Sequence, residues 1–249
     1  VFSFDHLETP GHVRMDDYEY DLNYYRDYMI DWMTHYGNNC WMSIFYNNHD
    51  NPRMVSKICK DARYHKRLSK LLAVMQLTLK GTPFIFQGDE MGLVNYDFTS
   101  MDQLTDVEAK GYYAEHVEKK GHDQVLAELL AGTREHTRVL LPWNEKLPAY
   151  HEGLTQEIRE DVQEVYKKLI ALRHKDDTLV YGDFEVLDRK KNCFTYKRSQ
   201  GDSAYIIDCN LSKKKRKAYP VGDDYRLIYA SASDLDELGG FGVRLWKRK

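Results

Sequence analysis

The first half of the chain alternates short continuous apolar runs with longer segments whose apolar residues recur every three or four positions. The continuous runs at 1–4, 41–46 and 82–88 predict buried strands. The periodic segments at 21–36 and 62–80 predict helices that each bury one face. Strands that are apolar on both faces and separated by single helices are typical of parallel βα units. The pattern therefore predicts an α/β fold.

The pattern changes in the second half of the chain. Residues 103–132 predict two further helices, and 155–175 predicts an amphipathic helix. From Leu179 onward the chain shows short alternating segments separated by turn residues, which indicate a small antiparallel β domain. We predict two domains, 1–177 and 178–249.

Composition and charge narrow the class of partner. The chain has 249 residues, 42% of them hydrophobic, and a formal net charge of −3 with both signs scattered, so no strong field for nucleic acid or membrane is indicated. The basic run 213–217 (KKKRK) could be a localisation or nucleic-acid patch, but a solvated hairpin edge is the favoured interpretation.

The sequence also bears on location. Four cysteines without CxxC spacing predict free thiols in a reducing compartment, and neither an export signal nor a membrane span is visible, so we expect a cytoplasmic protein. Val1 is not a methionine, so the true N-terminus is expected to lie upstream.

Residues 44–53, IFYNNHDNPR, place His49 and Asp50 where a predicted strand ends. In parallel α/β folds, polar residues at this position point into the functional face. A carboxylate beside an imidazole can hydrogen-bond the vicinal hydroxyls of a sugar, and bonds that tighten in an oxocarbenium-like transition state would speed glycoside cleavage. Local spacing alone leaves open that the cluster merely ends the strand and begins a turn.

Four motifs follow one another along the chain: VFSFDHLE at the start, FYNNHDNPR, LKGTPFIFQGDEMGL and GTREHTR (132–138). Together they resemble glycoside hydrolase family 13, the α-amylase superfamily, and within it the oligo-1,6-glucosidase and α-glucosidase branch. The resemblance implies that the chain is the C-terminal portion of a (β/α)8 TIM barrel, about strands 6 to 8, followed by a small antiparallel β-sandwich, domain C.

The resemblance also implies roles for four residues. Asp50 matches the catalytic carboxylate that stabilises the transition state without transferring a proton, and His49 matches its neighbouring hydroxyl ligand. Arg134 matches an arginine that grips the non-reducing glucose and pairs with an aspartate far upstream. Arg138 matches a second arginine, nearer the following subsite.

A nucleophile aspartate and a general-acid glutamate, which the family also needs, are not evident in the sequence. The carboxylates near predicted strand ends are Asp5, Glu8, Asp89 and Glu90, and the last two match a mainly structural segment of the family. We therefore predict a fragment that lacks both groups, whose partner is the N-terminal part of the barrel, either in a longer polypeptide or in a split enzyme. No cofactor is predicted, and any calcium or magnesium site would lie upstream of this chain.

The predicted activity is that of a retaining α-glucosidase acting on terminal α-glucosidic bonds of short oligosaccharides. The alternatives within the family are a transferase, a sucrose- or trehalose-type isomerase, or a phosphosugar hydrolase. A non-catalytic carbohydrate-binding half is the alternative outside enzymes.

Overall fold

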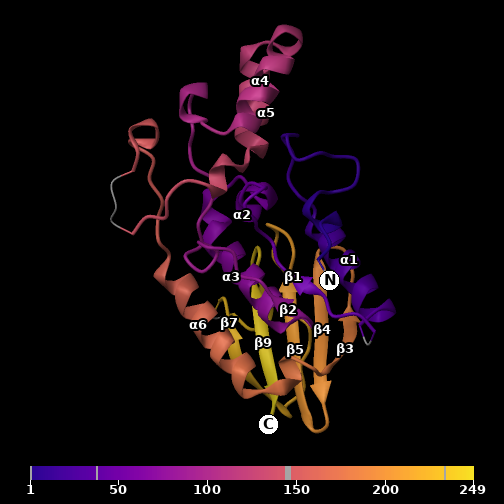
Figure 1. Ribbon diagram of the computed structural model, residues 1–249. Helices are drawn as coiled ribbons and strands as arrows, with labels where there is room; N and C mark the ends of the chain where they lie inside the picture. The colour runs from indigo at the N-terminus through magenta and orange to yellow at the C-terminus, as the bar shows by residue number, and fades with distance from the viewer. Residues whose placement is uncertain (1, 38, 144–146, 233) are drawn as a thin grey trace.

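Two parallel strands with helices packed around them form the first part of the molecule (Figure 1). The computed structural model describes residues 2–37, 39–143, 147–232 and 234–249. The elements here are η1 (Asp5–Leu7), α1 (Leu22–His35), β1 (Ser43–Ile44), α2 (Met54–Ile58), α3 (Ala62–Thr78) and β2 (Thr82–Pro83). β1 and β2 pair in parallel, as predicted, with Ser43 opposite Thr82.

Three predicted elements are shorter than expected or absent. Residues 2–4 form no strand; the exposed rings of Phe2 and Phe4 pack against Phe45 without a backbone ladder. Within 41–46 and 82–88 only two residues each are in strand, because a strand is defined by paired neighbours and β1 pairs only with β2 among the described residues.

A helical excursion follows β2 and stands at the end of the molecule away from the C-terminus (Figure 1). Its elements are η2 (Met101–Gln103), α4 (Val107–Lys120), α5 (His122–Gly132), η3 (Arg134–Thr137) and η4 (Ala149–His151). It has a small hydrophobic core of its own, which includes Phe98, Val125 and Leu129. The two helices predicted within 103–132 are thus confirmed.

The chain then returns along α6 (Glu160–Lys175), which begins five residues later than predicted. Residues 155–159 are in neither a helix nor a strand, and the backbone N–H of Arg159 donates to the Met91 carbonyl, which ties this segment to the loop after β2. The stripe of Val162, Val165 and Leu169 is buried as its spacing predicts.

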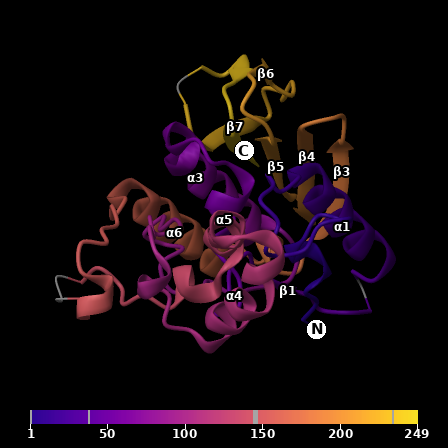
Figure 2. The same ribbon diagram turned by 90° about the horizontal axis from the view of Figure 1, so that it is seen from above.

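The last part of the chain forms an antiparallel sheet beside the helices (Figure 2). After η5 (Asp177–Leu179) the strands are β3 (Asp183–Asp188), β4 (Cys193–Gln200), β5 (Ser203–Asn210), β6 (Arg216–Lys217), β7 (Tyr225–Ala230), β8 (Glu237–Leu238) and β9 (Val243–Arg248). Five of them pair in the order β3-β4-β5-β9-β7, and β6 pairs with β8. In place of two full sheets of a sandwich, the described residues from β3 onward form one five-stranded and one two-stranded sheet.

The helices and the five-stranded sheet share one hydrophobic core. It joins α3 residues such as Leu72 and Leu77 to sheet residues such as Tyr196, Ile207 and Leu245. The division at 177/178 stays a prediction, since this core crosses it.

The basic run at 213–217 lies on the two-stranded sheet and its approach. Lys213 pairs with Glu19, and Lys215 pairs with Glu237 on the partner strand β8. Local acidic partners therefore offset part of the positive charge of this run.

Candidate active site

A buried hydrogen-bond network joins the loops that follow β1 and β2. The side chain of Asn47 donates to Asp89 Oδ1 at 2.7 Å and accepts from the Met54 backbone N–H at 2.7 Å. Arg53 is also buried and lies 3.3 Å from the same Asp89 oxygen. Burial raises the pKa of Asp89 to about 7, against the opposing charge of Arg53. Because its bonds point into the protein, Asp89 supports the loops and does not face a ligand.

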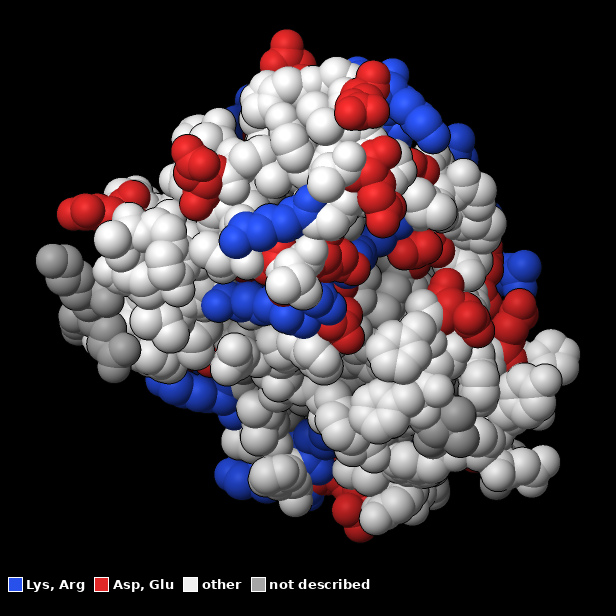
Figure 3. Space-filling model, turned by 45° about the horizontal axis from the view of Figure 1, so that its top comes forward, with Lys and Arg blue, Asp and Glu red and all other residues white. Residues whose placement is uncertain are grey.

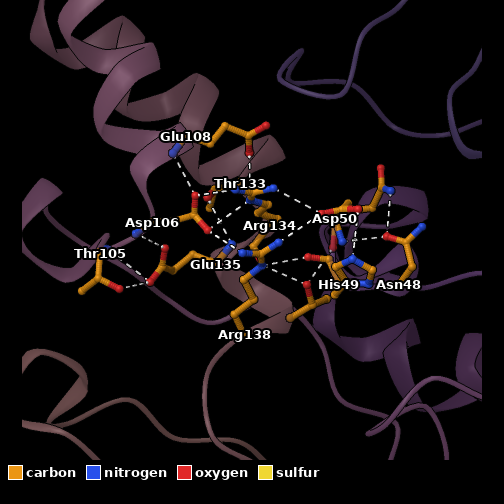
Figure 4. Close-up of polar contacts among 12 residues, drawn as sticks. Asn48, His49, Asp50, Thr105, Asp106, Glu108, Thr133, Arg134, Glu135 and Arg138 are labelled. Carbon is orange, nitrogen blue, oxygen red and sulfur yellow. Dashed lines mark hydrogen bonds and ion pairs between the residues drawn. The ribbon is translucent and has the colours of Figure 1, made fainter.

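Asp50 lies in a turn of the loop that follows β1 and faces two arginines (Figure 4). Its Oδ1 accepts from Arg134 Nη1 at 3.2 Å and from Arg138 Nη2 at 3.0 Å, while Oδ2 lies 3.2 Å from His49 Nε2. Its backbone N–H donates to Asn48 Oδ1 at 2.8 Å, which sets the turn. The Asp50 side chain is 49% exposed and that of His49 is 73% exposed. The structure thus brings the four predicted site residues together, with Asp50 and His49 open to solvent.

A second carboxylate, Asp106, holds the same two arginines from the other side. Asp106 Oδ1 accepts from Arg134 Nη2 at 2.8 Å, and Oδ2 accepts from Arg134 Nε at 3.1 Å and from Arg138 Nη1 at 2.7 Å. Burial opposes ionisation of this carboxyl, but the hydrogen bonds from Arg134 and the Glu108 backbone N–H outweigh it and lower the pKa of Asp106. Asp106 is therefore held as a carboxylate between two guanidinium groups.

The segment that carries the arginines is fixed by buried polar contacts. Glu135 accepts hydrogen bonds from the backbone N–H groups of Thr105 and Asp106 and from the Thr105 hydroxyl, at 2.6 to 3.1 Å. Thr133 begins η3 by accepting from the Glu135 backbone N–H, and the Thr137 hydroxyl donates to the Asn51 carbonyl at 3.1 Å. The last contact links the arginine segment directly to the loop of Asp50.

Sequence reasoning missed Asp106, Glu108 and Arg14. Arg14 donates to the backbone carbonyl of Asp50 and pairs with Glu108 at 2.5 Å. The available signal was TDVE (105–108), in which an aspartate precedes a helix and caps it. Nothing in the sequence linked that cap to Asp50.

The site mixes both signs of charge. On the face shown in Figure 3, Lys and Arg side chains lie next to Asp and Glu side chains around the middle of the surface. This balanced arrangement offers several hydrogen-bond donors and acceptors without a strong net field, which suits a neutral polyhydroxyl ligand better than a highly charged one.

Metal-binding clusters and membrane-spanning helices are both absent from the described residues. In the described part of the chain, no group of three or more His, Cys, Asp or Glu side chains is arranged to hold a metal ion. Among the same residues, no helix has the length and apolar character needed to cross a bilayer.

Comparison with known proteins identifies the family. A family model described as the alpha amylase catalytic domain matches residues 1–182. The chain belongs to the alpha-amylase family. The resemblance drawn from the sequence motifs is thereby confirmed.

Relatives of this alpha-amylase family chain include enzymes named for α-1,6-glucosidic bonds. The oligo-1,6-glucosidase of Parageobacillus thermoglucosidasius is 31% identical over 237 residues, which cover 86% of this chain and 42% of the relative. The glucan 1,6-alpha-glucosidase of Streptococcus pneumoniae serotype 4 is 30% identical over 239 residues, which cover 87% and 45%.

Solved structures show the same fold. The isomaltulose synthase from Klebsiella sp. LX3 has a TM-score of 0.80 at 25% identity, over 100% of this chain and 50% of that chain. The trehalose-6-phosphate hydrolase from Bacillus licheniformis has a TM-score of 0.84 at 24% identity, over 100% and 51%. The chain spans about half the length of the relatives it matches.

Proposed function

We propose that the protein containing this chain is a retaining α-glucosidase that hydrolyses terminal α-glucosidic bonds of short oligosaccharides, as an oligo-1,6-glucosidase does. In this proposal Asp50 stabilises the transition state, and His49, Arg134 and Arg138 bind the terminal glucose. The nucleophile and the general acid come from a part of the barrel outside this chain, so the chain alone is inactive.

The contacts and the exposure of the Asp50 carboxylate are the observation that supports this proposal most. Two guanidinium groups hold one of its oxygens, while the other lies beside the exposed His49 ring and half of the side chain is open to solvent. A fixed carboxylate with one oxygen that no arginine holds can accept hydrogen bonds from ring hydroxyls through that oxygen. When positive charge develops on the sugar, those bonds and the negative charge strengthen, which lowers the barrier to glycosidic cleavage.

The experiment that tests the proposal compares Asp50→Asn with wild type in the full-length protein. We expect wild type to release glucose from isomaltose and from an aryl α-glucoside. D50N keeps the size of the side chain but removes the charge, and kcat/KM should fall about 1,000-fold or more. Asp61→Asn is the matched control, because Asp61 caps α3 away from the site and Asn caps equally well. Near-wild-type rates in D50N would refute the role of Asp50.

A sucrose isomerase is a second candidate, favoured by the similarity to the isomaltulose synthase structure. Incubation with sucrose separates the two activities by their products. An isomerase yields isomeric disaccharides, whereas a hydrolase yields glucose and fructose. A full-length protein that binds isomaltose but leaves every substrate intact would instead indicate a non-catalytic carbohydrate-binding role.

A further inference from the structure

The carboxylate of Asp106 is the strongest partner of both site arginines. It receives three hydrogen bonds from Arg134 and Arg138, two of them at 2.7 and 2.8 Å. Asp50 receives two bonds from the same guanidinium groups, at 3.0 and 3.2 Å, and both go to one oxygen. Bidentate pairing of Arg134 by Asp106 is the stronger type of contact, so the arginines are held mainly by Asp106.

Burial reinforces this difference between the two carboxylates. The Asp106 side chain is 7% exposed, whereas that of Asp50 is 49% exposed. Electrostatic attraction is weaker near water than in the less polar interior. The arginines therefore have one buried partner that no ligand reaches and one open partner that a ligand can reach.

The position of Asp106 is itself fixed from two directions. Its side chain caps α4 by accepting from the Glu108 backbone N–H at 2.8 Å, and its own backbone N–H donates to the buried Glu135 at 2.9 Å. Asp106 thus belongs to the helical excursion, whereas Asp50 belongs to the loop after β1.

We propose that Asp106 is a positioning residue that keeps the two arginines from binding Asp50 too tightly. This inference rests on the proposed function of Asp50 as the group that binds ring hydroxyls. Two guanidinium groups close to one carboxylate repel each other and attract that carboxylate strongly unless a second negative charge is present. Without the charge at position 106, Arg134 keeps Glu108 Oε2 at 3.4 Å from its Nε and shares Asp50 with Arg138. The two guanidinium groups then draw the Asp50 oxygen beside His49 away from the substrate.

Asp106→Asn in the full-length protein tests this inference directly. Asn is as good a helix cap as Asp, so α4 keeps its start while the charge is lost. We expect kcat/KM for isomaltose to fall about 100-fold, with a higher KM as well as a lower kcat, and little change in the melting temperature. Asp106→Glu keeps the charge and should recover a large part of this loss. Asp61→Asn is again the control for an Asp-to-Asn change at a helix cap.

The double variant D106N/R138Q distinguishes positioning from simple structural support. Because Arg138 itself binds the sugar in the proposed function, R138Q is measured in both backgrounds. Its cost in kcat/KM should be about tenfold smaller in D106N than in wild type, since removal of one guanidinium restores part of the charge balance around Asp50. If Asp106 only supports the fold, R138Q lowers kcat/KM by the same factor in both backgrounds. That result would overturn the inference.

Failure of the proposed function gives a different result. If wild type neither hydrolyses nor isomerises an α-glucoside, the function of the site is wrong and the role of Asp106 falls with it. If wild type is active and D50N is inactive while D106N stays within about twofold of wild type, the function holds and only the positioning role is wrong. Should D106N fail to fold, D106E alone decides, since a charge-dependent role requires it to remain active.

Discussion

Acidification is expected to destabilise the protein through His136, which lies within the arginine segment. The His136 ring is 1% exposed. Its Nδ1 accepts from the Tyr96 backbone N–H at 3.1 Å, and its Nε2 lies 2.9 Å from the Leu130 carbonyl, to which it donates. With Nδ1 accepting, the neutral ring carries its proton on Nε2. A second proton on Nδ1 would face the N–H of Tyr96, so the folded state favours the neutral ring.

The size of the effect follows from the pKa of this ring. Burial lowers the pKa of His136 from 6.5 to about 4. Between these values the unfolded chain binds a proton that the folded chain does not. The stability that the neutral His136 ring contributes to the folded state is therefore complete above pH 6.5 and is lost as the pH falls to 4. At 1.36 kcal/mol for each pH unit, the free energy of unfolding changes by about 3 kcal/mol over this window.

Urea unfolding of the full-length protein across this pH window measures the effect. His136→Gln can place an amide N–H near the position of Nε2 but cannot titrate. We expect H136Q to be less stable than wild type at pH 7 and to have a flatter dependence on pH between the two pKa values. His35→Gln, at an exposed position near the end of α1, should keep the wild-type slope. Parallel curves for wild type and H136Q would refute the reasoning.

Two further predictions concern buried polar groups. Arg198 is fully buried and donates to five backbone carbonyls, so Arg198→Met should lower the free energy of unfolding by about 3–5 kcal/mol. The free energy of unfolding of Arg198→Lys should lie between those of R198M and wild type, because an ammonium group lacks the planar fork of a guanidinium. Equal denaturation midpoints for R198M and wild type would contradict this prediction. Asn47→Ala leaves Asp89 and the Met54 N–H without their 2.7 Å partner and should cost about 2–3 kcal/mol. Its activity should fall too, because the loop of Asp50 loses its support; an N47A variant as stable and active as wild type would show that the network is dispensable.

Helices were predictable from sequence because their evidence is local. The apolar spacing in 62–80 identifies α3 within a few residues, and the structure buries that face. Strand length was less predictable, since it depends on pairing with a neighbour and not on the apolar run itself. Phe2 and Phe4 illustrate this, because they read as a strand and lie as exposed rings beside Phe45.

The site was predictable only where a motif carried it. His49 and Asp50 stand at a strand end, which gives a local reason to nominate them, whereas Arg134 and Arg138 were nominated through the resemblance alone. Asp106 neither stands at a predicted strand end nor lies in a motif of the resemblance. Its role depends on a contact between segments far apart in the chain, and its sequence context indicates only a helix cap.

Asp50 and the two site arginines are held in place by different parts of the fold. Asp50 belongs to the loop after β1, which the buried Asn47 network supports, whereas Arg134 and Arg138 belong to an excursion with its own small core. Among the contacts that join the two parts are the Thr137 hydroxyl on the Asn51 carbonyl and the ion pairs of Asp50 itself. A packing change within the excursion core can therefore move the arginines without moving the carboxylate. Such a change alters the distance between the arginines and Asp50, and in the proposed function the binding of the terminal glucose depends on that distance.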